Sequence, residues 1–193
     1  MLYGKYQNLR DAAWRCLLEY EIDQLPVDVL KITKSSGIHV IKDSSVKKLK
    51  SQESGISLFD GETWYIIYNN REMVQRCRFT IAHELGHIFL GHPLKLGYHA
   101  RMIESDEAES EMQADMFAAR LLCPACVLWG LNLHTPNEIS RFCNVSYAAA
   151  KKRAARMQVL YERNKFLTSP LEREVYKKFC DYIKNNRVLH RGI

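Results

Sequence analysis

Five consecutive residues, His83-Glu84-Leu85-Gly86-His87, place two imidazoles four positions apart with a carboxylate between them. They lie in a segment, about Arg71 to Gly91, whose apolar spacing predicts a helix, with Pro93 as a stop. Residues four apart share one face of a helix, so both imidazoles can reach one metal ion. Glu84 would point about 100° further around the helix, which suits a general base. The alternative is two histidines that face solvent or are satisfied within a core.

A third ligand would separate these two readings. A metzincin site would need Gly at position 90 and His at position 93, but these positions hold Leu90 and Pro93, so that class is excluded. His92 follows His87 by five residues and precedes a proline, which places it on another side of the helix or beyond its end. We therefore expect the third ligand to be a carboxylate from a second helix, predicted over residues 105–122.

This second helix carries three glutamates that could serve: Glu107, Glu109 and Glu111. Glu111 is distinguished by Asp115 one turn later and by the small residues Ala114 and Ala118 beside it. Gly86 gives the first helix the same freedom, so the two backbones could approach closely enough for Glu111 to reach the metal. Asp115 would then accept the second N–H of a ligating histidine, unless it forms only a surface salt bridge.

Two blocks of sequence are similar to the signature of the ImmA/IrrE family of bacterial metallopeptidases. They are Arg78-Phe-Thr-Ile-Ala-His-Glu-Leu-Gly-His87 and Glu111-Met-Gln-Ala-Asp-Met-Phe-Ala-Ala-Arg-Leu-Leu-Cys-Pro124. The resemblance covers about residues 10–130. It departs from the family pattern at Asp115, where many members have Asn, and at Cys123, where Met is common.

The resemblance implies a zincin-like minimal metalloprotease fold with a gluzincin-like zinc site. Carried over residue by residue, His83, His87 and Glu111 would bind Zn²⁺ and Glu84 would be the catalytic base. It also implies an intracellular protein substrate, a helix-turn-helix repressor of a phage or mobile element. The alternative function is a non-catalytic regulator that binds a repressor or DNA, although a structural metal site would not need Glu84 between its histidines.

The apolar patterns predict an α+β fold. N-terminal helices are expected over residues 8–20 and 26–35, followed by a small, mostly antiparallel three-stranded sheet and the two site helices. The expected strands are 38–41, 56–59 and 63–68, the last two joined by an Asp60-Gly61 turn. The remainder, 125–193, reads as mainly helical. We expect residues 1–130 to form the peptidase domain and residues 131–193 a helical region packed on the same core.

Within that C-terminal region, residues 137–153 resemble a helix-turn-helix, with a Val-Ser turn before a basic second helix. The formal net charge of the chain is +6, and residues 151–193 carry 12 Lys and Arg against 4 Asp and Glu. DNA is therefore a possible partner, and a helix pair that merely completes the core is the alternative.

The sequence shows neither a secretory leader nor an apolar run long enough for a membrane span, so we expect a cytoplasmic protein without membrane partners. The six cysteines lack a disulfide framework. The pair in Cys123-Pro-Ala-Cys126 has a metal-like spacing, but a second such pair is missing. Two half-buried thiols at a helix end are the favoured interpretation.

Two parts of a peptidase site stay open at this level. The group that stabilises an oxyanion could be Tyr98, His99 or Tyr161, and the sequence does not choose among them. An extended peptide substrate could lie along an edge of the sheet, for which Thr63–Tyr68 is the expected strand.

Overall fold

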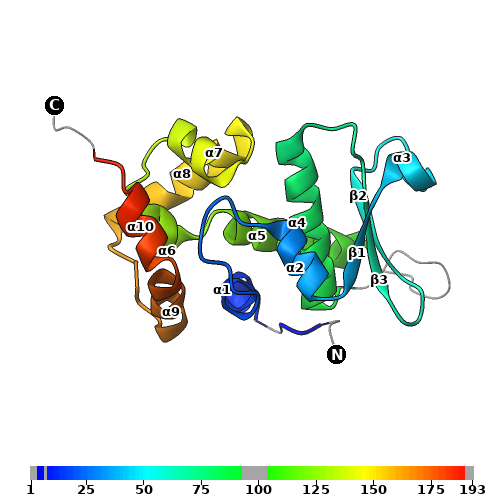
Figure 1. Ribbon diagram of the computed structural model, residues 1–193, viewed down its shortest axis with the longest axis horizontal. Coiled ribbons are helices and arrows are strands. Elements are labelled where there is room, and N and C mark those ends of the chain that lie inside the picture. Colours follow the sequence, from blue (N-terminus) through cyan, green and yellow to red (C-terminus); the bar gives the residue numbers. More distant parts are fainter. Residues whose placement is uncertain (1–3, 7, 93–103, 190–193) are drawn as a thin grey trace. The chain divides into compact units, whose positions relative to one another are not determined.

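The computed structural model describes residues 4–6, 8–92 and 104–189 of the chain, which form two compact units (Figure 1). Unit 1 contains Met1–Ala13 and Asp28–Ala118, and unit 2 contains Trp14–Val27 and Ala119–Ile193. The mixed content of helices and a small sheet confirms the predicted α+β, zincin-like class. The domain boundary expected at residue 130 stays a prediction.

Unit 1 contains a three-stranded sheet in the order β1-β3-β2. The strands are β1 (Ile38–Lys42), β2 (Gly55–Phe59) and β3 (Trp64–Tyr68). The predicted turn between β2 and β3 is present, because the Asp60 carboxylate accepts hydrogen bonds from the N–H groups of Glu62 (2.9 Å) and Thr63 (2.8 Å). Gly61 follows with a φ of 106°, which a residue without a Cβ adopts at little cost.

The sheet is not mostly antiparallel as expected, since it has one pairing of each kind. β2 pairs with β3 in antiparallel fashion, whereas β1 pairs with β3 in parallel. A parallel neighbour requires a crossover connection, and residues 43–63 supply it by passing through a short helix, α3 (Asp43–Val46), and through β2 itself. The residue patterns of the single strands do not predict the strand order β1-β3-β2. As a result β3, not β2, is the central strand.

Capping residues set the start of one helix and the end of another in unit 1. α2 (Val29–Ser35) begins three residues later than expected because Asp28 caps it, its carboxylate accepting from the N–H groups of Leu30 and Lys31 at 3.0 Å. α4 (Val74–Leu90) ends at Gly91, whose φ of 74° gives the left-handed cap typical of glycine. α4 packs against β2 and β3.

In two helices, the division between the units falls within the helix. α1 (Leu9–Glu19) matches the expected helix over residues 8–20, and α5 (Glu104–Leu122) matches the one expected over 105–122. The loop predicted after Pro93 lies almost wholly outside the described residues.

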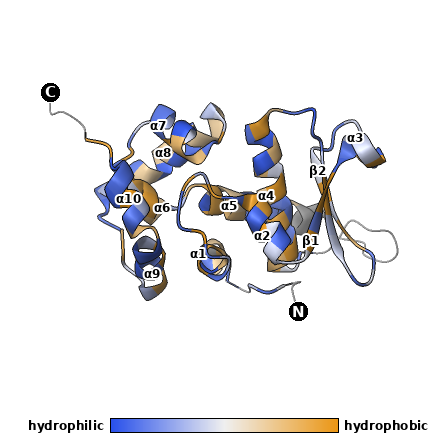
Figure 2. Ribbon diagram, in the orientation of Figure 1, coloured by the Kyte–Doolittle hydropathy of each residue, from blue (hydrophilic) through white to orange (hydrophobic). Residues whose placement is uncertain are grey.

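Unit 2 is helical, as predicted for residues beyond 125. Its helices are α6 (Ala125–Gly130), α7 (Pro136–Cys143), α8 (Tyr147–Glu162), α9 (Pro170–Lys178) and α10 (Cys180–Asn186). Figure 2 shows α6 as mainly hydrophobic and α9 as mainly hydrophilic, and α6 is the helix with the most continuous burial in this unit. None of the helices in the described ranges is long and apolar enough to cross a bilayer.

α7 and α8 are two helices in contact, joined by a short turn, over the segment whose sequence resembles a helix-turn-helix. Thr135 and Glu138 form a capping box at the start of α7, and Asn144 ends that helix in the left-handed conformation with a φ of 50°. Ser146 then caps α8 by accepting from the N–H of Ala149 at 3.3 Å. The turn is therefore specified by local capping chemistry.

The thiols of unit 2 differ from expectation in their burial. Cys123 and Cys126 are fully buried, not half-buried, and both are free thiols, as is the buried Cys143. The segment between α5 and α6 turns into the core at Pro124, and this places both side chains inside. Among the described residues these thiols do not form a metal-binding group.

Candidate metal centre

The two histidines of α4 lie on one face of the helix with their Nε2 atoms 3.0 Å apart. Their side chains are largely buried, with exposed fractions of 15% for His83 and 12% for His87. Glu84 lies between them in the sequence and is 7% exposed. The four-residue spacing therefore directs two imidazole nitrogens to one point.

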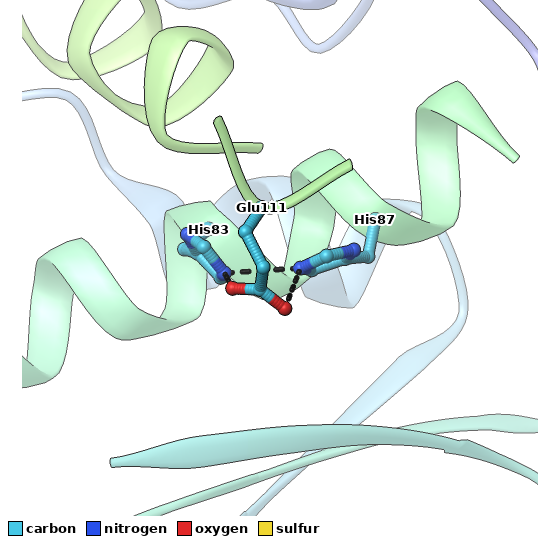
Figure 3. Close-up of side chains that lie close together, drawn as sticks. All are labelled: His83, His87 and Glu111. Atoms are coloured by element: carbon cyan, nitrogen blue, oxygen red, sulfur yellow. Dashed lines mark hydrogen bonds and ion pairs between the residues drawn. The ribbon is translucent and has the colours of Figure 1, made fainter. Parts of the chain in front are cut away.

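Glu111 reaches the same point from α5 (Figure 3). Its Oε2 lies 3.2 Å from Nε2 of His83, and its Oε1 lies 3.6 Å from Nε2 of His87. The three ligand atoms lie within 4.8 Å of one another, and they form the single such group found in the described part of the chain. The structure thus brings together the three residues that the sequence analysis singled out.

The close approach of α4 and α5 depends on Gly86, as expected. A Cβ at this position would lie 3.1 Å from Cα and 3.3 Å from the carbonyl oxygen of Ala114, and 3.2 Å from the ring of Phe117. Ala114 and Ala118 are both fully buried. Any larger side chain at Gly86 would push against backbone atoms of α5 and move Glu111 away from the histidines.

Asp115 contacts the outer nitrogen of one histidine. Its Oδ1 lies 2.9 Å from Nδ1 of His83, and its side chain is 62% exposed. A carboxylate only accepts hydrogen bonds, so Nδ1 of His83 carries the proton and Nε2 is directed toward Glu111. This is the contact expected of Asp115 from the sequence.

The outer nitrogen of His87 has a different neighbour, His92, for which the sequence suggested no contact of this kind. Nδ1 of His92 lies 3.1 Å from Nδ1 of His87, and Nε2 of His92 lies 3.1 Å from Oε1 of Gln113. His92 has left the helix and is folded back by the left-handed turn at Gly91, its N–H donating to the carbonyl of His87 at 3.0 Å. In the sequence, the glycine just after the last helical turn was the signal that could have predicted this reversal. The contact of His92 with Gln113 had no such signal.

The electrostatics of the two buried histidines are opposed. Desolvation disfavours the charged form of His83, but its hydrogen bond to Glu111 and the negative charges of Glu84, Glu111 and Asp115 outweigh it and raise its pKa. Burial, partly offset by Gln113, lowers the pKa of His92. The surroundings therefore favour positive charge at His83 and disfavour it at His92.

This donor set fits a divalent metal ion. Two imidazole nitrogens that face each other at 3.0 Å repel through their lone pairs unless a proton or a cation lies between them, and the nearby carboxylates favour the cation. Nitrogen and carboxylate oxygen donors suit zinc and other first-row divalent ions.

The other candidates from the sequence take different places. Glu109 accepts a hydrogen bond from Gln113 Nε2 at 2.9 Å. The side chain of Glu107, and the residues Tyr98 and His99, lie outside the described part of the structure. Tyr161 belongs to unit 2, where its ring stacks on His134 at a centroid distance of 4.7 Å.

Comparison with known proteins agrees with this geometry. The family model of the IrrE N-terminal-like domain, Peptidase M78, matches residues 33–155, a range that begins in α2, includes the sheet, α4 and α5, and ends in α8. A match to residue 155 extends the family resemblance past residue 130, the end expected for it from the sequence. No curated protein matches the chain significantly.

Among solved structures, a Mycobacterium tuberculosis transcriptional regulator is similar, with a TM-score of 0.55 and 16% sequence identity. The alignment covers 77% of this chain and 47% of that protein, so this chain spans about half of its length. At this identity the likeness shows a shared fold. The family match, which covers more than half of the sequence, goes further: the chain belongs to the Peptidase M78 family of IrrE N-terminal-like domains, a family of metallopeptidases.

Proposed function

We propose that this protein is a zinc-dependent endopeptidase in which His83, His87 and Glu111 hold the ion and Glu84 is the general base. The observation that supports it is the convergence of two imidazole Nε2 atoms and a carboxylate within 4.8 Å, with a nearly buried carboxylate one residue after the first histidine. A bound zinc ion would supply Lewis acidity, polarising a peptide carbonyl and lowering the pKa of water toward 7.

Glu84, the proposed base, is buried beside β2. A Cβ at Gly55, the first residue of β2, would lie 3.5 Å from Cγ of Glu84, so the backbone of β2 passes directly beside this side chain. Its carboxylate would take a proton from the attacking water and deliver it to the leaving amine. A side chain at Gly55 would collide with the methyl group of Thr80, so the glycine allows this close packing of β2 on α4.

The strand that would receive a substrate is β2, which corrects the expectation for Thr63–Tyr68. β3 has both edges paired, by β1 and β2, so it has no backbone groups left for a peptide. β2 is an edge strand in the described part of the sheet and runs past Glu84. An extended peptide added along β2 would bring its carbonyl groups past the base.

The direct test combines metal content with cleavage. Elemental mass spectrometry of the purified protein should find about one zinc per chain. Glu84→Gln should retain zinc and lose at least about 10³-fold in cleavage rate, because it removes the base and keeps the ligands. Glu174→Gln, an exposed change on α9, is the matched control and should cleave normally. Turnover retained in Glu84→Gln would contradict the assignment.

The proposed substrate is an intracellular helix-turn-helix repressor of a phage or mobile element. The support is the family resemblance, and the similarity of the fold to that of a transcriptional regulator agrees with a role in transcription. The test incubates the zinc-loaded protein with a repressor encoded beside its gene and measures intact mass. Discrete fragments that require zinc and Glu84 would support this substrate class; an intact repressor would exclude that repressor as the substrate.

A second candidate is a non-catalytic regulator that binds DNA through α7–α8. The observation in its favour is that Lys151, Lys152 and Arg156 are exposed on α8, the second helix of the pair. Binding of this kind releases counterions, so an electrophoretic titration should show affinity that falls steeply with salt. Lys151→Glu should weaken it. Binding without salt sensitivity, or none, would remove this candidate.

A further inference from the structure

A continuous series of hydrogen bonds joins the surface of α5 to the proposed metal ligand His87. It begins at Glu109, whose Oε1 lies 2.9 Å from Nε2 of Gln113. Oε1 of Gln113 lies 3.1 Å from Nε2 of His92, and Nδ1 of His92 lies 3.1 Å from Nδ1 of His87. We call these residues, Glu109, Gln113, His92 and His87, the imidazole relay.

The chemistry of each group fixes the direction of every hydrogen bond in the relay. An ionised carboxylate only accepts, so Glu109 must face the NH₂ of the Gln113 amide, which leaves the amide oxygen toward His92. That oxygen only accepts, so Nε2 of His92 carries the proton. In a neutral imidazole the other nitrogen is then an acceptor, and Nδ1 of His92 accepts from the N–H at Nδ1 of His87.

From this we infer that Glu109, Gln113 and His92 are positioning residues that set the tautomer of His87, holding its proton on Nδ1 and directing the Nε2 lone pair toward the proposed metal ion. The inference rests on the proposed function only in naming the ion's ligands. His92 is 7% exposed, so water does not readily substitute for it. The turn at Gly91 and the backbone hydrogen bond to His87 hold its ring in place.

Both proposed histidine ligands are therefore held in the tautomer with the proton on Nδ1, but by different acceptors. Asp115 acts on His83 directly through a carboxylate 2.9 Å from Nδ1. At His87 the acceptor is a neutral ring, and the carboxylate of Glu109 acts through two intervening side chains. Both routes leave an Nε2 lone pair directed at the same point, where the nitrogens are 3.0 Å apart.

The experiment measures tautomers and metal affinity separately. Histidine ¹⁵N chemical shifts of the metal-free protein, recorded at a pH where the imidazoles are neutral, should show His87 protonated at Nδ1 and His92 at Nε2. His92→Phe keeps the ring but removes the acceptor, so His87 should shift to a mixture of tautomers. Zinc affinity, measured against a competing chelator, should fall about tenfold to a hundredfold.

Two further variants keep the test independent of folding defects. Gln113→Leu, on the partly exposed surface of α5, should produce the same shift in tautomer with a smaller loss of affinity. His92→Asn restores an oxygen acceptor and should recover most of the affinity. The matched control is Gln158→Leu, because Gln158 donates to Glu162 at 3.2 Å in the same i,i+4 arrangement on α8.

The outcomes separate this inference from the proposed function. A wild-type tautomer and wild-type affinity in both His92→Phe and Gln113→Leu would overturn the relay, whether or not the protein cleaves peptides. If the wild-type protein binds no zinc, the proposed function fails. The ¹⁵N shifts of His87 in the metal-free variants then still decide whether the relay exists.

Discussion

At the scale of single residues, the surroundings of a side chain decide whether it can bind a metal. His83 is buried beside carboxylates that favour positive charge. Cys126 is buried among apolar groups, and desolvation, with the negative charge of Glu172 adding to it, raises its pKa to about 12. A thiolate there is disfavoured at any physiological pH, so the Cys123-Pro-Ala-Cys126 pair does not compete with the histidines for metal.

The raised pKa of Cys126 predicts slow alkylation in the native protein. Its pKa is above that of an unfolded cysteine, about 8.5. The thiol therefore stabilises the fold below that pH, and its contribution declines as the pH rises toward 12. Iodoacetamide at pH 8 should label Cys126 only after denaturation, as read by peptide mass spectrometry. Cys180, which is partly exposed, is the internal control, and equal labelling of both in native protein would contradict the prediction.

At the scale of elements, the centre depends on how closely α4 and α5 approach. The contact is made by a glycine against the backbone of an alanine, Gly86 against Ala114, so it has almost no room to adjust. β2 also approaches α4 closely at Gly55, because a Cβ there would collide with the side chain of Thr80, one helical turn before Glu84. Glycines therefore allow close approach at two contacts of α4, one with α5 and one with β2.

Gly86→Leu should separate the two helices. Overpacking of this kind costs about 1–3 kcal/mol in unfolding free energy, and displacing Glu111 should also weaken zinc binding. Chemical denaturation and a chelator competition assay measure the two effects. Ala155→Leu, on an exposed position of α8, is the control and should change neither quantity appreciably. Unchanged zinc affinity in Gly86→Leu would mean that α5 does not need this approach.

Ser57→Pro tests the edge of β2 as the place where a substrate pairs. Along β2, alternate residues direct their backbone N–H and C=O groups toward β3 and away from it. Ser54 and Asp60 both form backbone hydrogen bonds across this pair, to Asn69 and Thr63, so the N–H of Ser57 points away from β3. Proline there removes a donor on the outer edge without breaking a hydrogen bond of the sheet.

We therefore expect Ser57→Pro to reduce kcat/KM at least tenfold, which corresponds to about 1.4 kcal/mol, with zinc binding retained. Leu58→Pro is the contrasting variant, because the N–H of Leu58 faces β3 and its loss should destabilise the sheet. Full cleavage by a folded Ser57→Pro protein would show that peptides do not pair with this strand.

At the scale of the molecule, a ligand that binds only the folded state adds to its stability. Zinc at about 100 times its dissociation constant should stabilise the protein by about 2.7 kcal/mol. Because His83, His87 and Glu111 converge only in the folded chain, calorimetry should show the unfolding temperature rise when zinc is added. His83→Ala should remove the shift. A shift that persists in that variant would place the ion elsewhere.

The sequence was sufficient wherever neighbouring residues carry the information. The helix spacing of His83 and His87, the glycine that ends α4 and the turn at Asp60 are local features, and the structure has each of them. The role of Glu111 could be predicted from the sequence because its helix also carries small residues. What could not be predicted is non-local: the central place of β3 and the meeting of His92 with Gln113 depend on pairings between distant segments.

The proposed ligands, the proposed base and the imidazole relay all lie within residues 83–115. One short coding segment therefore encodes both the ion-binding groups and the groups that orient them. Recombination that exchanges this segment as a block would transfer the complete centre between relatives with the same scaffold, and a crossover between α4 and α5 would separate ligands from their supports. Within the family, we expect the centre to be inherited or lost as a single unit.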